Sequence, residues 1–469
     1  MHVWSLCGWI EAPQPSRQNG TGRRGRACYA VAGREKGLAS WIERFASIIE
    51  KYFQSWRLKI RRAGVRGVEK SEGTERKSPS FRSQMAPLLF LVGIFFLNFI
   101  SRIVLSPLLP SVEKDLKIGH EEAGSFFFIL SSGYCIMLLG SSFVSSRLSH
   151  RKTIILSTVA LGGALLFVGL SHELWMVRLG LFVLGMAAGL YLPSGIATIT
   201  QLVNPKHWGK AISIHELAPN SSFVVAPLIA EMLLRWFSWQ GIFILFGIFS
   251  VLSGVLFSIF GRGGKFCGEP LNVSTLRVIL GEPSFWIMMA LFSLGISGTF
   301  GVFAMLPLYL VSERGMNQVW ANTLVGLSRI SPVGIAILSG WVTDRLGPKR
   351  ALRVIFLANG LAVILLGLVS ESWMVALIFL QPMLASSFFP PGFAALSRIG
   401  DTRFKSIAVS LTMPVSFLLG GGAVPAMVGA VGQVRSFSAG FVILGGMLLG
   451  GAVLVGYLKF DKSPASLSA

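Results

Sequence analysis

Residues 340–350 read Gly-Trp-Val-Thr-Asp-Arg-Leu-Gly-Pro-Lys-Arg, a short basic turn between two long apolar runs. A degraded copy, Ser-Arg-Leu-Ser-His-Arg-Lys at residues 146–152, lies 198 residues earlier and also separates two apolar runs. A repeat at this distance indicates that the chain is built from two similar halves. The stretches on either side of the two turns therefore decide which fold each half adopts.

Two further pairs of motifs occur at nearly the same separation. Tyr-Leu-Pro-Ser-Gly at residues 191–195 is matched by Phe-Phe-Pro-Pro-Gly at residues 388–392. A lysine precedes a proline by nine residues in both halves, at 210 and 219 and again at 405 and 414. Three coincidences in the same order favour an internal duplication over chance.

Long apolar runs alternate with short polar loops from residue 86 to the end of the chain. The runs lie near residues 86–109, 124–146, 153–171, 174–200, 211–234, 239–260, 285–311, 320–343, 351–370, 372–396, 407–431 and 437–458. Each is long enough to cross a hydrocarbon layer of about 30 Å as an α-helix. The sequence therefore predicts an all-α membrane protein with twelve transmembrane helices in two pseudo-symmetric six-helix bundles.

The composition agrees with a lipid environment. Hydrophobic residues make up 52% of the chain and charged residues 13%, about half the charged share of a soluble domain. The net charge of +21 would also suit nucleic acid. However, the positive charges of the main body lie in short loops, where the positive-inside rule places them. We expect a lipid bilayer and no nucleic acid as partner.

Loop charges predict the orientation. With the segment before residue 86 on the inside, the inner loops and the C-terminal tail hold seventeen lysines and arginines. The outer loops then hold only Lys114, Lys117, Arg235, Arg314 and Arg435. This asymmetry predicts that both termini are cytoplasmic. Short loops and a compact tail favour a bacterial inner membrane, and we expect a monomer.

Residues 1–84 differ from the rest of the chain because they are basic and contain low-complexity patches. Within them, residues 40–62 carry aromatic and aliphatic residues at helical spacing between lysines and arginines, a pattern typical of a helix on an anionic membrane surface. The alternative is that this extension is not translated, since Met85 directly precedes the first apolar run. No secretory signal peptide is recognised.

From residue 86 to residue 460 the chain resembles the major facilitator superfamily. The residues that look like the cytoplasmic loop motif of that family are Gly340, Asp344, Arg345, Gly347, Lys349 and Arg350. The resemblance implies bundles at 86–260 and 285–460, joined by a linker at 261–284. It also implies a central site that opens alternately to each side of the membrane.

In many members of that family the acid of the loop motif acts as a cytoplasmic latch by pairing with an arginine and a helix end. Asp344 could take this role, whereas Ser146, at the same place in the first half, cannot do so ionically. The alternative is that the basic residues of both turns only anchor the chain on the cytoplasmic side.

Two arginines inside the apolar runs are the strongest candidates for a substrate site. A charge within a membrane helix costs about 2.5 kcal/mol or more, so it normally faces a cavity. Arg102 lies in the first run and Arg329 in the eighth, one in each half. Guanidinium groups from both halves could grip a small anion; the alternative is that each is structural. Polar residues that could line the same cavity are Tyr134, Asn98 and Gln381, with Asn220 and Tyr309 as weaker candidates.

His215 and Glu216 in the fifth run are the candidates for proton coupling. Histidine titrates near neutral pH, and burial can bring a glutamate into the same range. Neighbouring residues on a helix point about 100° apart, so only one of the two can face the cavity. The alternative is a hydrogen bond between helices that fixes their packing.

The sequence excludes several other functions. It holds no phosphate-binding loop, dinucleotide fingerprint or zinc-protease motif, and its four cysteines form no metal-spaced pair. We therefore expect no enzyme activity, no cofactor and no metal. The predicted function is secondary transport of a small organic anion, driven by protons or by exchange. Efflux of drugs or metabolites is the alternative, and a non-transporting membrane sensor is a third possibility.

Overall fold

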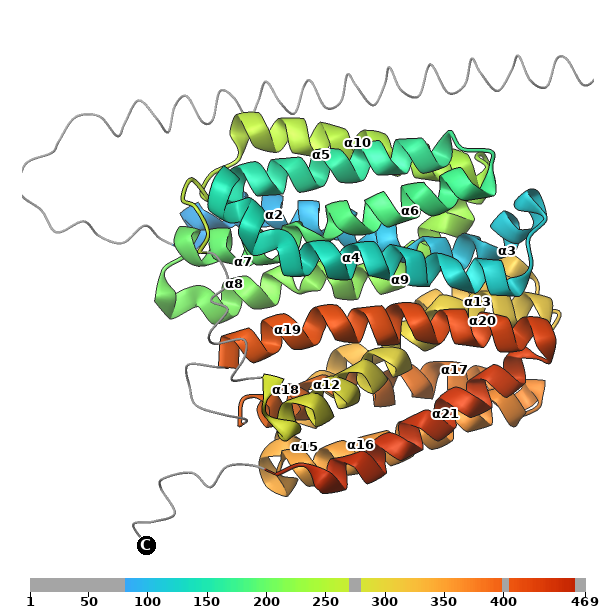
Figure 1. Cartoon of the computed structure of the whole chain (residues 1–469). Helices are drawn as coiled ribbons and strands as arrows, with labels where there is room; N and C mark the ends of the chain where they lie inside the picture. The colour runs from blue at the N-terminus through green and yellow to red at the C-terminus, as the bar shows by residue number, and fades with distance from the viewer. Residues whose placement is uncertain (1–80, 270–279, 399–404, 460–469) are drawn as a thin grey trace, which may run out of the picture. The chain divides into compact units, whose positions relative to one another are not determined.

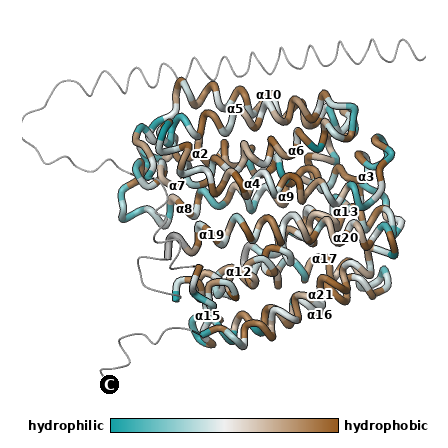
Figure 2. The backbone as a smooth tube through the Cα atoms, viewed as in Figure 1, coloured by the Kyte–Doolittle hydropathy of each residue, from teal (hydrophilic) through white to brown (hydrophobic). Residues whose placement is uncertain are grey.

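The structure is a computed structural model that describes residues 81–269, 280–398 and 405–459. Every regular element in these ranges is a helix, and the helices run back and forth side by side (Figure 1). Eleven helical segments of the described chain are long and apolar enough to cross a membrane. Figure 2 shows hydrophobic residues along the helices and hydrophilic residues mainly at their ends. The predicted all-α membrane fold is confirmed.

The first half of the described chain contains nine α-helices and one short 3₁₀ turn. They are α2 (Phe81–Ile103), α3 (Leu105–Leu116), α4 (His120–Leu148), α5 (His150–Gly169), α6 (Leu174–Gly189), α7 (Tyr191–Leu202), η1 (Pro205–His207), α8 (Trp208–His215), α9 (Leu217–Leu234) and α10 (Trp239–Phe260). The predicted surface helix at 40–62 lies outside the described residues, as does 270–279 of the predicted linker.

The second half begins at Pro283 and includes two π-helical turns. Its elements are α12 (Pro283–Ile296), η2 (Ser297–Gly301), α13 (Val302–Ser312), α14 (Gln318–Ser328), α15 (Pro332–Leu346), α16 (Pro348–Leu368), α17 (Glu371–Ser386), α18 (Phe389–Leu396), α19 (Lys405–Leu418), η4 (Leu419–Ala423), α20 (Val424–Val434), α21 (Phe437–Leu454) and η5 (Val455–Tyr457).

Prolines divide five membrane segments of the described chain into two helices each. The first helix ends at Ile103, Gly189, His215, Ser328 or Ser386, and a proline follows four residues later, at Pro107, Pro193, Pro219, Pro332 or Pro390. Proline has no N–H, so it cannot bond to the carbonyl four residues before it, and its ring crowds that carbonyl. The helix therefore ends at the residue that loses its acceptor bond.

The eighth predicted span, 320–343, is the segment where this effect matters most. It forms α14 and α15, separated at residues 329–331, rather than one continuous helix. This segment is not among the eleven that cross as continuous helices, because its interruption covers three residues, whereas the other four segments are interrupted at only one or two. Arg329 lies at the interruption. Pro414, in contrast, lies inside α19, which continues through it.

Equivalent helices of the two halves pack in equivalent ways. In the first half α5 packs along α10, and in the second half α16 packs along α21. The halves meet where α4 contacts α20, where α9 contacts α14, and where α3 contacts α13. In Figure 1 the blue-to-green helices lie on one side and the yellow-to-red helices on the other. The domain bounds 86–260 and 285–460 remain a prediction.

The two turns of the repeat share one unusual backbone conformation. Gly347 has φ 76° and ψ 153°, and Ser149, 198 residues earlier, has φ 75° and ψ 153°. This region is strained for every residue that has a Cβ atom, and proteins occupy it almost only with glycine. The turn at Ser149 thus keeps the geometry of the repeat although its glycine is missing.

We therefore predict that Ser149→Gly stabilises the protein by about 1 kcal/mol, because glycine removes the strain at this position. Gly347→Ser should destabilise it by a similar amount. Thermal unfolding in detergent measures both changes. Ser149→Ala is the control, since it keeps the Cβ atom and should bring no gain. Equal melting temperatures for Ser149→Gly and Ser149→Ala would contradict the prediction.

Candidate functional site

Arg102 lies at the end of α2, two residues before the interruption caused by Pro107. Its side chain is buried, and its guanidinium lies 4.8 Å from the ring centre of Phe99 and 4.3 Å from that of Tyr134. The Nε atom has no hydrogen-bond partner among the described residues. Arg102 and Tyr134 line a small cavity, which both halves of the chain enclose.

Arg329 reaches the same region from the second half. Its guanidinium lies 5.2 Å from the ring centre of Phe223 and 4.9 Å from that of Phe303. One terminal nitrogen donates to the carbonyl of Thr299 at 3.3 Å, and Nε has no partner among the described residues. Arg329 lies between α14 and α15, at the interruption that the proline at 332 causes.

Six aromatic rings connect the two arginines, and we call them the aromatic cluster. They are Phe99, Tyr134, Phe223, Phe300, Phe303 and Phe417. Their centres lie 5.0–5.6 Å apart along the connected pairs, mostly edge to face. Phe303 lines the cavity beside Arg102 and also lies beneath Arg329. The structure thus places both arginines against one aromatic cluster.

Neither arginine has an acidic partner within the described residues. The salt bridges there are His120–Glu113 and His215–Glu216, and both involve a histidine. Burying an unpaired charge is costly, and each contact with the face of an aromatic ring compensates only part of that cost, by about 2 kcal/mol or somewhat more when desolvated. A site with two cations and no carboxylate can bind an anion.

The other predicted lining residues have different positions. Asn98 is buried and donates to the carbonyl of Ala188 at 3.2 Å. Gln381 is buried and donates to the carbonyl of Gly298 at 2.7 Å and to Asn359. These amides join neighbouring helices, and neither lines the cavity beside Arg102. Of the three polar residues proposed with the arginines, only Tyr134 lines that cavity.

Tyr309 and Asn220, the weaker candidates, also make bonds outside the cavity. The hydroxyl of Tyr309 donates to the carbonyl of Leu366 at 3.0 Å and accepts from Arg314. The Asn220 amide donates to the carbonyl of Glu216 within its own helix, and its side chain is exposed.

His215 and Glu216 point in different directions, as their adjacency predicts. The His215 ring is buried, stacked on Phe95 at 4.3 Å between centres, with Nε2 at 3.2 Å from the hydroxyl of Tyr191. Glu216 is half exposed, and its carboxylate lies 3.6 Å from Nδ1 of His215. It lies at the break between α8 and α9, seven residues before Phe223 of the aromatic cluster.

The loop motif at residues 340–350 lies where α15 ends and α16 begins. The Arg345 guanidinium lies 4.0 Å from the centre of the Trp341 ring. Lys349 donates through Nζ to the carbonyls of Gly456 and Leu458, both at 2.8 Å, at the end of the last helix. These two contacts fix the turn against its neighbours.

The remaining motif residues are free of such contacts. Asp344 and Arg350 are exposed, and Asp344 forms no salt bridge with the part of the chain that the structure describes. A Cβ atom added at Gly340 would meet open space. The latch role of Asp344 remains a prediction for another conformation.

Hydrogen bonds between the halves gather at one end of the helices, which we call the closed end. Ser106 donates to the carbonyl of Phe303 at 2.8 Å, and Asn322 donates to the carbonyl of Pro107 and to Glu231 at 3.2 Å. At the other end Glu216 and Asn220 are exposed. The outer loops predicted from the sequence, such as the one with Lys114 and Lys117, lie at the closed end.

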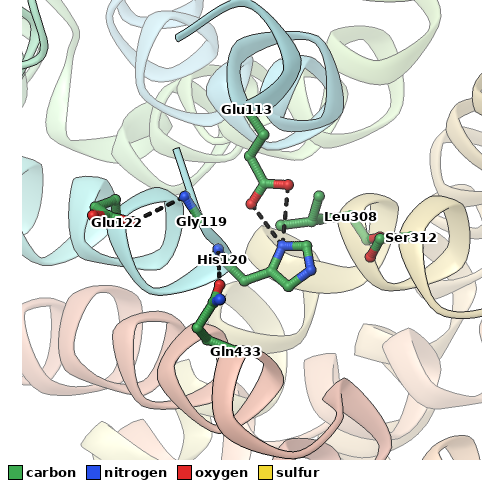
Figure 3. Close-up of polar contacts among 7 residues, drawn as sticks. All are labelled: Glu113, Gly119, His120, Glu122, Leu308, Ser312 and Gln433. Carbon is green, nitrogen blue, oxygen red and sulfur yellow. Dashed lines mark hydrogen bonds and ion pairs between the residues drawn. The ribbon is translucent and has the colours of Figure 1, made fainter. Parts of the chain in front are cut away.

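Figure 3 shows polar contacts of the closed end around His120, the first residue of α4. Its Nδ1 lies 2.9 Å and 3.1 Å from the two carboxylate oxygens of Glu113 in α3 (Figure 3). Its backbone N–H donates to Oε1 of Gln433 in α20 at 2.8 Å. Gly119 donates to Glu122 at 2.9 Å. His120 thus links both halves at this end.

The comparison with known proteins identifies the family. The model of the Major Facilitator Superfamily matches residues 91–371 and 330–468. This protein belongs to the Major Facilitator Superfamily, a family of transporters and not of enzymes. It is therefore an integral membrane protein that transports a small solute.

Two curated bacterial relatives match over most of the main body. An uncharacterised MFS-type transporter, YuxJ of Bacillus subtilis, is 26% identical over 65% of this chain and 74% of its own length. The 4-hydroxybenzoate transporter PcaK of Acinetobacter baylyi is 21% identical over 70% of this chain and 84% of its own length.

The fold matches a solved transporter. The crystal structure of a bacterial homolog to the human lysosomal transporter Spinster, in an inward-facing and occupied conformation, has a TM-score of 0.72. It is 16% identical and covers 82% of this chain and 100% of that chain. This likeness confirms the fold and carries no information on the substrate.

Sequence reasoning located the two arginines but did not find the aromatic cluster. The chain contains 35 phenylalanines, and in an apolar run a ring that faces lipid has the same local pattern as one that faces a cavity. Only the packing of α2, α9, α13 and the two π-helical turns separates Phe99, Phe223 and Phe303 from the others.

We predict that Gly429→Leu opens the closed end. A Cβ atom at Gly429 would lie 2.4 Å from the carbonyl oxygen of His120, so the substitution must push α20 away from α4. In a cysteine-free background, Ser106→Cys reports this opening, because Ser106 is fully buried between the halves. Maleimide should label Ser106→Cys several-fold faster when Gly429→Leu is present.

Gly446→Leu is the matched control, since a Cβ atom there meets open space. A second reporter, Ser157→Cys, is buried within the first half and should stay protected, which separates opening from unfolding. Unchanged labelling of Ser106→Cys would show that this contact does not hold the closed end together.

Proposed function

We propose that this protein carries a small organic anion across the membrane by alternating access. The observation that carries the proposal is the pair of buried guanidiniums, Arg102 and Arg329, which meet at one aromatic cluster without a carboxylate partner. Guanidinium matches a carboxylate with two parallel hydrogen bonds. An anion at this site would satisfy donors of both halves at once.

The position of the site explains how the anion would drive the conformational change. A ligand shifts a conformational equilibrium only by its different affinity for the two states. Because one arginine belongs to each half, the distance between them changes when the halves rock. An anion held by both favours the conformation in which both reach it, and its release frees the halves to move apart again.

The relatives give partial support to an anionic substrate. PcaK is named for 4-hydroxybenzoate, which is a carboxylate, and it matches this chain over most of its length. Identity of 21% is too low to transfer a substrate, since transporters of one fold move unrelated molecules. The proposal therefore depends on the arginines.

Glu216 is the better of the two predicted coupling groups. It lies at the break between α8 and α9, seven residues before Phe223, it is half exposed, and its carboxylate is near Nδ1 of His215. A carboxylate in this position can exchange protons with the solvent at the open end. His215 is buried against Phe95 and Tyr191, where its role is to position Glu216 and to pack the helices.

The orientation of the proposed transporter follows from the loop charges. The basic inner loops place the open end toward the cytoplasm and the closed end outside. In a bacterial inner membrane both termini would then be cytoplasmic. In this orientation the hydrogen bonds between the halves lie at the outer end, which favours an inward-facing conformation with Glu216 toward the cytoplasm.

We predict that Arg329→Gln weakens anion binding by about 10- to 100-fold, as expected when a hydrogen bond to a charged group is lost. The measurement is thermal stabilisation of the purified protein by a panel of carboxylates, sulfonates and neutral drugs. Arg329→Lys should bind with intermediate affinity, because lysine keeps the charge but not the paired donors.

Arg345→Gln is the matched control, because it removes an exposed guanidinium in the last turn of α15, away from the aromatic cluster, and should leave binding unchanged. Stabilisation by neutral drugs alone, or equal anion binding by Arg329→Gln and the unmodified protein, would reject the anion site. Efflux of apolar compounds would then be the better account, with both arginines structural.

Glu216→Gln should uncouple transport from protons. We expect the variant to exchange labelled anion across proteoliposomes at a rate near that of the unmodified protein, and to lose accumulation driven by a pH gradient. Glu371→Gln, at the exposed start of α17, is the control. If Glu216→Gln still accumulates the anion under a pH gradient, another group carries the proton.

A further inference from the structure

We infer that the transported anion carries an aromatic ring, so that the substrate class is an aromatic carboxylate and not a small aliphatic acid. This inference rests on the proposed function, because it describes the body of the anion whose charge the two arginines bind. It follows from what surrounds those arginines.

Each cation lies against two rings of the cluster. Arg102 lies against the rings of Tyr134 and Phe99, at 4.3 Å and 4.8 Å from their centres. Phe99 contacts Phe223 at 5.4 Å. Arg329 in turn lies against the rings of Phe223 and Phe303, at 5.2 Å and 4.9 Å. A planar ring with a carboxylate matches this neighbourhood of charge and rings, because it offers an anion to a guanidinium and a ring face or edge to a phenylalanine.

The cavity has little to offer a hydrated aliphatic anion. Besides Arg102, its polar side chains are Ser131 and Tyr134, and the rest of its lining is apolar and largely aromatic. An acetate-sized anion would lose its water shell and gain few contacts with the apolar lining. An aromatic ring that entered a widened cavity could make edge-to-face contacts with Phe300 and Phe417.

The backbone around the cluster departs from regular α-helix. Phe300 lies in the π-helical turn Ser297–Gly301, and Phe417 lies two residues before the π-helical turn Leu419–Ala423. Such turns interrupt the regular hydrogen bonds of a helix and occur frequently at functional sites. Gly420 lies so near α12 that a Cβ atom there would be 2.3 Å from the carbonyl oxygen of Ser293.

These two turns pack against each other from neighbouring spans. Both rings are only half-buried. The small cavity seen here can therefore widen by a shift of Phe300 and Phe417, without breaking a continuous helix. Phe300 and Phe417 contact each other with ring centres 5.1 Å apart. The ring of a substrate would enter between them and replace this contact with one contact to each ring.

The test compares four probes on the purified full chain by calorimetry. Benzoate and phenylacetate have a ring and a charge, cyclohexanecarboxylate has the charge and a similar size without the ring, and benzyl alcohol has the ring without the charge. We expect the better aromatic acid to bind about 3- to 10-fold tighter than cyclohexanecarboxylate, the gain typical of an aromatic pair. Benzyl alcohol should not bind measurably.

Phe300→Leu should remove the preference for the ring and keep the binding of cyclohexanecarboxylate. Phe167→Leu, which changes an exposed ring in α5, is the matched control and should keep the preference. Retained cyclohexanecarboxylate binding shows that Phe300→Leu is folded; if that binding is lost, Phe303→Leu is measured in its place.

The outcomes separate the two proposals. If cyclohexanecarboxylate binds as tightly as the aromatic acids, and binding still depends on Arg329, the anion transporter stands and the aromatic inference is wrong. The aromatic inference is also wrong if Phe300→Leu, or Phe303→Leu measured in its place, still prefers the aromatic acids. If no acid binds, or if benzyl alcohol binds as well as benzoate, the anion function itself is rejected.

Discussion

Two positive charges buried in the membrane without acidic partners are the constraint on which this structure depends. A bilayer makes a charge within a helix costly, and proteins keep one there mainly where it faces a cavity or a partner. Arg102 and Arg329 each lie against two aromatic rings, which compensate only part of the cost. An anion that enters between the halves would pair with these charges and relieve the remaining cost, which would strengthen its binding.

The prolines place the functional groups within otherwise regular helices. Arg102 precedes one interruption by two residues, Glu216 lies at a second, and Arg329 lies at a third. In each segment the proline removes one backbone bond, and the chain changes direction next to the side chain in question. The same sequence feature thus divides the spans and positions three of the proposed site residues. Breaks of this kind are tolerated in a membrane where the freed groups face protein or a cavity.

The sequence predicted the class of fold and the two arginines, because both depend on local composition. Apolar runs of sufficient length define membrane helices, and an arginine within one is recognisable without a structure. The repeat was predicted from motifs, and Ser149 shows that it persists in the backbone where the residue has changed. The interruption at Arg329 and the aromatic cluster were not predicted. Asn98 and Gln381 have the polarity of cavity residues, but their amides bond to carbonyls of adjacent helices, which only tertiary packing decides.

The most direct test of the account is to locate a bound anion. Crystals of the full chain grown with 4-iodobenzoate would show the iodine by its anomalous scattering. Our account predicts one strong peak inside the aromatic cluster, with the carboxylate density within hydrogen-bond distance of Arg102 or Arg329, and no such peak in Arg329→Gln crystals. A peak on the lipid-facing surface alone, or an empty cluster at saturating ligand, would contradict the claim that these arginines form an anion site.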